Sequence, residues 1–108
     1  MKRINIVLNA SVIVALLWLG VASQANAYTV YGQGTATCGT WIAERERGGY
    51  KDMEYWVLGY ITAAGYYETN KLKKSDRQAL RAWIDNYCQK NPLSQLVDGA
   101  QGLVRALK

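Results

Sequence analysis

The chain has 108 residues, with 13 Lys or Arg, 8 Asp or Glu, two cysteines and no histidine. Without histidine there is no Ser-His or Cys-His nucleophile system, and most zinc sites are excluded. No glycine-rich segment has the P-loop or dinucleotide-binding pattern in the right context. Paired carboxylates are the remaining catalytic option, but Asp76 and Asp85 are nine residues apart, and Asp52 and Glu54 point to different helix faces. We expect solvated or ion-paired acids, and a protein that is not an enzyme and binds no metal or cofactor.

Residues 1–27 have the composition of a cleavable signal peptide. Lys2 and Arg3 form a positive start, Val12–Val21 is apolar apart from one glycine, and Ala25-Asn26-Ala27 is a small-x-small cleavage site. The alternative is an uncleaved anchor, but polar residues leave the apolar run short of the roughly 20 residues that a membrane span needs. We therefore expect a protein that is periplasmic in a Gram-negative source and otherwise secreted, with no stable membrane insertion after cleavage.

Cleavage would leave one domain of 81 residues that is only mildly basic. The leader removes two of the 13 basic residues and no acid, so 11 basic side chains face 8 acidic ones, a formal charge of +3. Much of the positive charge lies in one stretch, at Lys71, Lys73, Lys74, Arg77 and Arg81. Such a run is usually a solvated face, and an exported protein rarely meets nucleic acid, so we expect no nucleic-acid binding.

The two cysteines, Cys38 and Cys88, favour a structural disulfide. An even cysteine count is typical of disulfides in exported proteins, whereas redox-active thiols usually lie close together as CxxC. A domain of this size is marginally stable without such a staple. In the chain-entropy model, closing a loop of this length contributes about 4 kcal/mol.

Residues 28–37 are rich in glycine and threonine and have no helical period, which predicts an extended or flexible arm. Tyr28 or Tyr31 could pack this arm on the domain; otherwise it is disordered. The first helix is predicted over 38–47. Thr37 is its candidate N-cap, and Gly48 ends it by accepting the left-handed conformation.

Three further helices follow in residues 52–108. Apolar residues repeat at three and four from Asp52 to about Glu68, although the aromatic and β-branched segment YWVLGYIT leaves a strand as the alternative. Ser75 and Gln78 form an S-x-x-Q capping box at the start of the third helix. Asn91-Pro92 is predicted to stop that helix and to start the last, whose apolar stripe begins at Leu93. The overall prediction is an all-α domain of four helices over 38–108, with one buried disulfide tying helix one to helix three.

Aromatic residues divide into core and surface candidates. Trp41, Trp56 and Trp83 each lie on an apolar stripe and are expected in the core. Four tyrosines lie off the stripe of the second helix or at its ends, and tyrosine is enriched at protein interfaces. These candidate partner-binding residues are Tyr50, Tyr55, Tyr66 and Tyr67. In so small a core, about half of the tyrosines could instead be packed.

The cysteine placement and helix pattern resemble two families of small exported helical proteins. Cys38-Gly-Thr-Trp41 opens the first helix, Trp83-Ile-Asp-Asn-Tyr-Cys88 closes the third, and an amphipathic helix follows. This arrangement resembles the HdeA-type periplasmic acid-stress chaperones. The segment 56–65, with residues 87–93, is also similar to the Tai-type immunity proteins of type VI secretion.

The two resemblances imply different activities. An HdeA-like protein would be a homodimer at neutral pH that opens in acid and binds unfolded clients, and carboxylate protonation would be the trigger. The dense charged tails of such chaperones are absent here. A Tai-like protein would neutralise one toxin partner through a fixed surface. A third interpretation is a structural accessory of the cell envelope. All three predict an exported protein that acts through protein–protein contacts.

Overall fold

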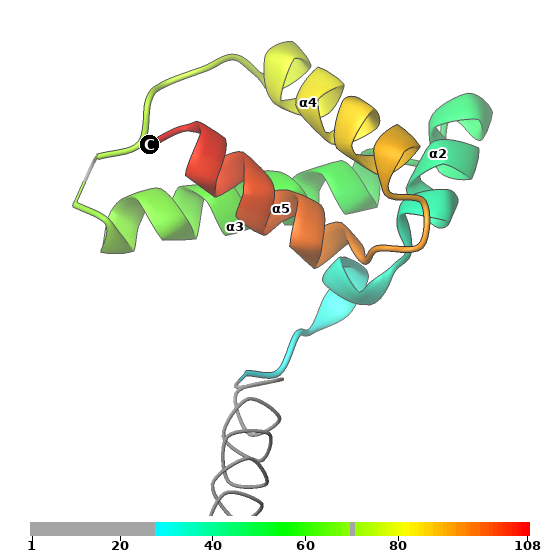
Figure 1. The fold of residues 1–108 in the computed structure, drawn as a ribbon, viewed down its shortest axis with the longest axis horizontal. Helices are drawn as coiled ribbons and strands as arrows, with labels where there is room; N and C mark the ends of the chain where they lie inside the picture. Colours follow the sequence, from blue (N-terminus) through cyan, green and yellow to red (C-terminus); the bar gives the residue numbers. More distant parts are fainter. Residues whose placement is uncertain (1–27, 70) are drawn as a thin grey trace, which may run out of the picture.

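The computed structural model describes residues 28–69 and 71–108. The expected signal peptide, residues 1–27, lies outside the described residues. The described chain is all-α, as predicted, and contains no strand (Figure 1). Its elements are a short 3₁₀-helix, η1 (Gly32–Thr35), and the helices α2 (Cys38–Arg47), α3 (Lys51–Tyr67), α4 (Arg77–Lys90) and α5 (Leu96–Ala106).

The helix α2 has the bounds and caps that its sequence predicts. The Thr37 hydroxyl accepts a hydrogen bond from the Thr40 N–H at 3.1 Å, which satisfies one of the donors left free at a helix N-terminus. At the other end Gly48 is left-handed, with φ of +85°, a conformation that costs glycine no steric strain. The strand alternative for the next segment is wrong, because α3 continues through YWVLGYIT as one helix.

The predicted capping box at Ser75 is wrong by one residue. The N-cap of α4 is Asp76, whose carboxylate accepts the Ala79 N–H at 2.8 Å, and the helix begins at Arg77. Because Asp and Ser cap helices about equally well, the sequence offers two adjacent candidates with little to separate them.

The predicted start of the last helix is also wrong. Asn91 and Pro92 form a turn, closed by the Ser94 N–H on the Asn91 carbonyl, and Leu93 is 94% exposed instead of joining the apolar stripe. The helix α5 begins at Leu96. The segment before it lies extended because it pairs with residues 36–38. The Cys38 N–H donates to the Ser94 carbonyl, and the Leu96 N–H donates to the Ala36 carbonyl, both at 2.7 Å.

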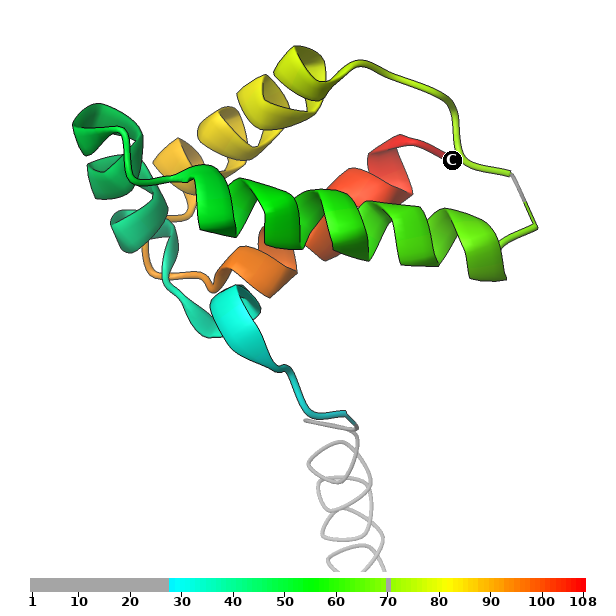
Figure 2. The same ribbon diagram turned by 180° about the vertical axis from the view of Figure 1, so that it is seen from behind.

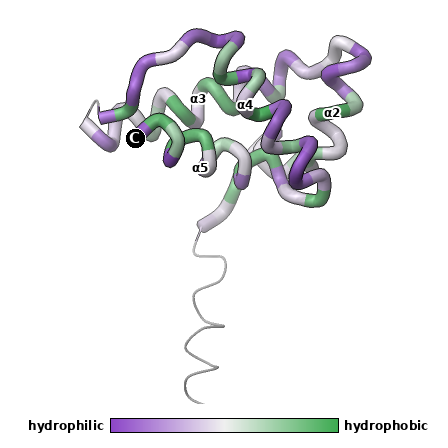
Figure 3. The backbone as a smooth tube through the Cα atoms, turned by 45° about the horizontal axis from the view of Figure 1, so that its top comes forward, coloured by the Kyte–Doolittle hydropathy of each residue, from purple (hydrophilic) through white to green (hydrophobic). Residues whose placement is uncertain are grey.

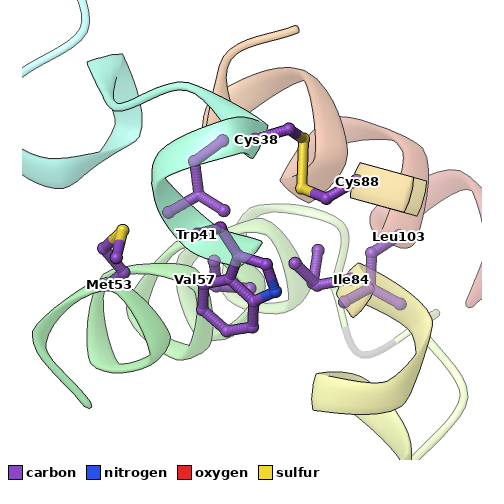
Figure 4. Close-up of a cluster of buried hydrophobic side chains, with 8 residues drawn as sticks. Cys38, Trp41, Met53, Val57, Ile84, Cys88 and Leu103 are labelled. Atoms are coloured by element: carbon purple, nitrogen blue, oxygen red, sulfur yellow. A yellow bond between two sulfur atoms is a disulfide. The ribbon is translucent and has the colours of Figure 1, made fainter. Parts of the chain in front are cut away.

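The core lies where α2, α4 and α5 meet the inner face of α3. The predicted disulfide between Cys38 and Cys88 is present, and it joins the start of α2 to the end of α4 with both sulfurs fully buried. Figure 4 shows Trp41 beside the disulfide, among apolar side chains from the other helices. Trp41 is 1% exposed, whereas Trp56 and Trp83, also expected in the core, are half-buried and pack against it.

The arm at 28–37 is packed against α3 and α5, and it contains the 3₁₀-helix η1, which the sequence did not predict. Its anchor is Trp56, whose indole N–H donates to the Tyr31 carbonyl at 2.8 Å. The indole ring also lies over Gly34, where any Cβ would overlap it. The Tyr31 side chain itself is 80% exposed, so at this residue the arm docks through its backbone. The Tyr28 hydroxyl accepts a hydrogen bond from the side-chain amide of Gln101 on α5.

The helices are unevenly packed. The helices α3 and α5 lie side by side, and α4 packs on α2 and α5 (Figure 1). By contrast, α3 and α4 make no comparably extensive contact along their backbones. Over the part of the chain that the structure describes, no helix combines the length and apolar character that a membrane crossing requires.

Candidate functional site

The four candidate tyrosines do not form one surface. Tyr50 precedes α3 and is half-buried against the core, so packing accounts for it. Tyr55 is 56% exposed in the first half of α3. Tyr66 and Tyr67 lie at the other end of the helix, 77% and 82% exposed, with their ring centroids 5.3 Å apart. The structure therefore separates one packed tyrosine from three exposed ones.

The outer face of α3 joins two of these tyrosines. Figure 2 shows α3 in front of the other helices, with none of the described elements crossing it. Residues three and four apart share a helix face. The exposed face comprises Tyr55, Gly59, Thr62, Ala63 and Tyr66, and we call it the outer face of α3. No charged residue occurs between Tyr55 and Tyr67 in the sequence, so this face has no charged side chain of its own along three turns of helix. At its Tyr55 end the Arg77 guanidinium of α4 lies 5.0 Å from the ring centroid, in cation–π geometry.

Glycine in the middle of this face is not required by the fold. A Cβ at Gly59 would meet nothing within 4 Å, and the residue lies inside a regular helix. Glycine in a helix interior costs about 0.5–1 kcal/mol relative to alanine. The glycine therefore lowers the stability of α3 without allowing any close packing inside the described chain.

A second feature, which sequence reasoning missed, is a buried carboxylate between α3 and α4. Glu54 is 2% exposed, although the sequence suggested only that it would be solvated or ion-paired. Arg81 donates to one of its oxygens at 2.8 Å, and Arg77 donates to the other at 3.0 Å. The signal was present in the sequence as two arginines four residues apart, which share one face of α4.

A matching ion pair joins α2 to α4. The Arg45 guanidinium donates to both oxygens of Asp85 at 3.0 Å, the bidentate geometry that makes such pairs strong. The Trp41 indole N–H donates to the same carboxylate at 2.8 Å, so the pair also fixes the orientation of the central core side chain.

The Tyr50 ring connects the two ion pairs. The Arg45 guanidinium lies 4.5 Å from its centroid, and the Arg81 guanidinium lies 5.1 Å from it, both in cation–π geometry. The residues Arg45, Tyr50, Glu54, Arg77, Arg81 and Asp85 thus form one network, which we call the arginine–carboxylate cluster. The side chains of this cluster link α2, α3 and α4 to one another.

Burial and ion pairing act in opposite directions on Glu54. Burial raises the pKa of its carboxyl group, and the hydrogen bonds and charges of Arg77 and Arg81 outweigh this effect, so the pKa lies below its ordinary value. The same contacts raise the pKa of Arg77, first through the hydrogen bond to Glu54. Hydrogen bonding to Asp85 likewise raises the pKa of Arg45. The Glu54 carboxylate is thus held ionised by two arginines, which indicates a structural role.

Two small hollows lie beside α4 on the described surface. One hollow of about 250 Å³ lies between α2 and α4 beside the Arg45–Asp85 pair, and another of about 290 Å³ lies along α4 beside Trp83. Both are at or below the lower limit for ligand pockets. Within residues 28–69 and 71–108, no group of three or more acidic or cysteine side chains is placed to hold a metal ion.

Comparison with known proteins identifies no relative: no family model matches the chain, and no curated protein or solved structure has significant similarity to it.

Proposed function

We propose that this is a small exported protein of the cell envelope that binds a protein partner through the outer face of α3. The observation that carries the proposal is an exposed helix face with no charged residue of its own, with tyrosines at both ends and between them a glycine that the fold does not require. Interface centres are depleted of charged residues and enriched in tyrosine. A glycine that the fold does not need lets the backbone of a partner approach closely.

Export is supported by two features that are independent of this surface. Residues 1–27 have the composition of a signal peptide. The buried disulfide fits the oxidising compartments in which such bonds persist. A fixed surface with one partner is also what the Tai-like resemblance implies, with a toxin as that partner.

The test places a charge in the centre of the outer face. Gly59→Arg adds a long cationic side chain where nothing lies within 4 Å, so the fold should be retained. Ala82→Arg is the matched control, because Ala82 is an exposed position on α4. Each variant is expressed in the native host, cross-linked in the envelope and recovered. We expect one cross-linked partner that is lost with Gly59→Arg and retained with Ala82→Arg.

Retention of the same partner by both variants would contradict the proposal. If the partner is a second copy of the chain, size-exclusion chromatography of the pure protein would show a dimer that Gly59→Arg dissociates. An accessory of the envelope would instead be cross-linked to a structural component of that layer, at the same face of α3.

A second function, an acid-activated chaperone, is favoured by the burial of Glu54. Protonating all eight acidic side chains would raise the formal charge of residues 28–108 from +3 to +11. Protonation of Glu54 would also leave Arg77 and Arg81 without their shared counter-charge. The helix α4 could then separate from α3 and expose the core face to unfolded clients, as the HdeA-like resemblance implies.

Client breadth distinguishes the two functions. A chaperone should bind a hydrophobic dye and suppress aggregation of several unrelated proteins at about pH 3, but not at pH 7, where the carboxylates are ionised. A protein that protects no client in acid would exclude this second function and leave the single-partner function in place.

A further inference from the structure

The end of the molecule where α3 and α5 finish carries concentrated positive charge. The connector from α3 to α4 runs past the end of α5, because the Lys73 N–H donates to the Leu107 carbonyl at 2.6 Å (Figure 1). Figure 3 shows this connector as a mainly hydrophilic stretch of chain. Five basic side chains of the connector and of the end of α5 are exposed: Lys71, Lys73, Lys74, Arg105 and Lys108. We call them the basic end.

The basic end accounts for the whole net charge of the described side chains. Its five cations face two acids of the connector, Glu68 and Asp76, which leaves +3. Elsewhere in residues 28–108, six basic side chains are balanced by six acidic ones. The charge of this protein is therefore segregated to one end.

Most of these cations are not neutralised by an ion pair in the part of the protein that the structure describes. Within the described chain, only Lys108 of the five forms an ion pair, with Glu68 at 3.1 Å. The arginines of α2 and of the first turns of α4 are each bonded to a carboxylate instead. Four of the five cations of the basic end thus have no carboxylate partner among the described residues.

Two exposed tyrosines, Tyr66 and Tyr67, lie at the end of α3, where the connector begins. Tyrosine is enriched where protein meets the membrane–water interface, since its ring is apolar and its hydroxyl is polar. Lysine stems cover apolar surface while their ammonium groups reach charged headgroups. The two hollows beside α4 are lined by other residues and involve none of these side chains.

We propose that the basic end binds the surface of a bilayer that contains anionic phospholipid. The inference goes beyond the proposed function, because it concerns where the protein is held and not which protein it binds. An array of five exposed cations, four of them without a carboxylate partner among the described residues, lies beside exposed tyrosines and fits a diffuse negative surface. The attraction acts within about 10 Å at 0.1 M salt, and each lysine near such a surface strengthens partitioning about fivefold.

The test compares two triple variants that have the same net charge. Lys71→Gln, Lys73→Gln and Lys74→Gln together remove the cations of the connector. Arg47→Gln, Lys51→Gln and Lys90→Gln together remove three exposed cations from other parts of the molecule. Both sets reduce the formal charge of residues 28–108 from +3 to zero. Both also keep the same N-terminus, so any contribution of residues 1–27 is equal.

Co-sedimentation with phosphatidylcholine vesicles, with and without phosphatidylglycerol, measures the partition coefficient. We expect binding only when phosphatidylglycerol is present, weakening as salt is raised. The connector variant should lower the partition coefficient about a hundredfold, whereas the control variant should lower it less than about threefold. Equal losses in the two variants, or equal binding to neutral vesicles, would overturn the proposal. Absence of binding to anionic vesicles would also overturn it, and would leave an acidic protein as the occupant of the basic end.

Discussion

The two ends of α4 are attached to the rest of the molecule by different kinds of interaction. The C-terminal end is covalently joined to α2 through Cys88, inside a dry core. The N-terminal end is attached to α3 through Arg77 and Arg81, which share the buried carboxylate of Glu54. The first attachment is insensitive to pH, whereas the second depends on one ionised group. The helix is therefore covalently anchored at one end, and we expect the other end to be the one that responds to acid.

Packing reinforces this contrast. Around the disulfide, main-chain hydrogen bonds tie residues 36–38 to residues 94–96, in addition to the covalent bond. At the other end, α3 and α4 are joined mainly by long side chains that cross the space between them. A buried side-chain cluster is weakened when one of its members loses its charge, because its partners are left unsatisfied, whereas the backbone pairing contains no titrating group.

Removing the disulfide should have the largest effect on stability. Replacing both Cys38 and Cys88 with alanine should lower the free energy of unfolding by about 4 kcal/mol, because the unfolded chain regains the freedom of a loop of about 50 residues. Urea denaturation of the variant and of the oxidised protein measures the difference. A loss below about 1 kcal/mol would mean that the anchored end of α4 is held by packing alone.

Glu54→Gln should have the next largest effect, about 2 kcal/mol. The buried side chain keeps its shape but loses its charge, and the two arginines that face it are partly exposed and regain some hydration. The pH dependence is more diagnostic. Because the pKa of Glu54 is depressed in the folded state, its contribution is complete above its unfolded pKa of about 4.3 and is lost as pH falls through the folded value.

The variant should therefore lose less stability than the wild type between about pH 5 and pH 2. Urea denaturation at several pH values provides the measurement. Glu68→Gln is the matched control, since its ion pair with Lys108 is solvent-exposed and should contribute less than 1 kcal/mol. Parallel pH profiles for the wild type and Glu54→Gln would show that the acid response lies elsewhere.

The sequence predicted the disulfide at the anchored end of α4, but it did not predict the buried carboxylate at the other end or the correct start of α5. Cysteines on apolar stripes predicted the disulfide between helices one and three, since both residues had to face the core. The start of α5 was placed too early, because proline is equally suited to a turn and to a first helical turn. Only the pairing of residues 94–96 with the arm decides between them, and that pairing is a long-range contact.

The candidate surface was also predicted only in part, because its outcome depends on contacts between elements. Helical period alone placed Tyr55 and Tyr66 away from the core, and both are exposed. Tyr50 was a candidate because it flanks the start of that helix, yet its ring packs on Trp41 with centroids 6.1 Å apart and lies beside two arginines. A residue at a helix end takes its environment from neighbouring elements, which a one-helix pattern does not contain.

The smallest effect concerns the cap at the responsive end of α4. Asp76→Ala should lower the free energy of unfolding by about 1 kcal/mol, because the Ala79 N–H loses its acceptor. Ser75→Ala should change it by less than about 0.5 kcal/mol, because Ser75 is exposed and does not cap the helix. Thermal or urea unfolding of the two single variants makes the comparison. A larger loss with Ser75→Ala would restore the capping box that the sequence suggested. It would also move the start of α4 one residue closer to the connector, at the end of the helix that is held by charge.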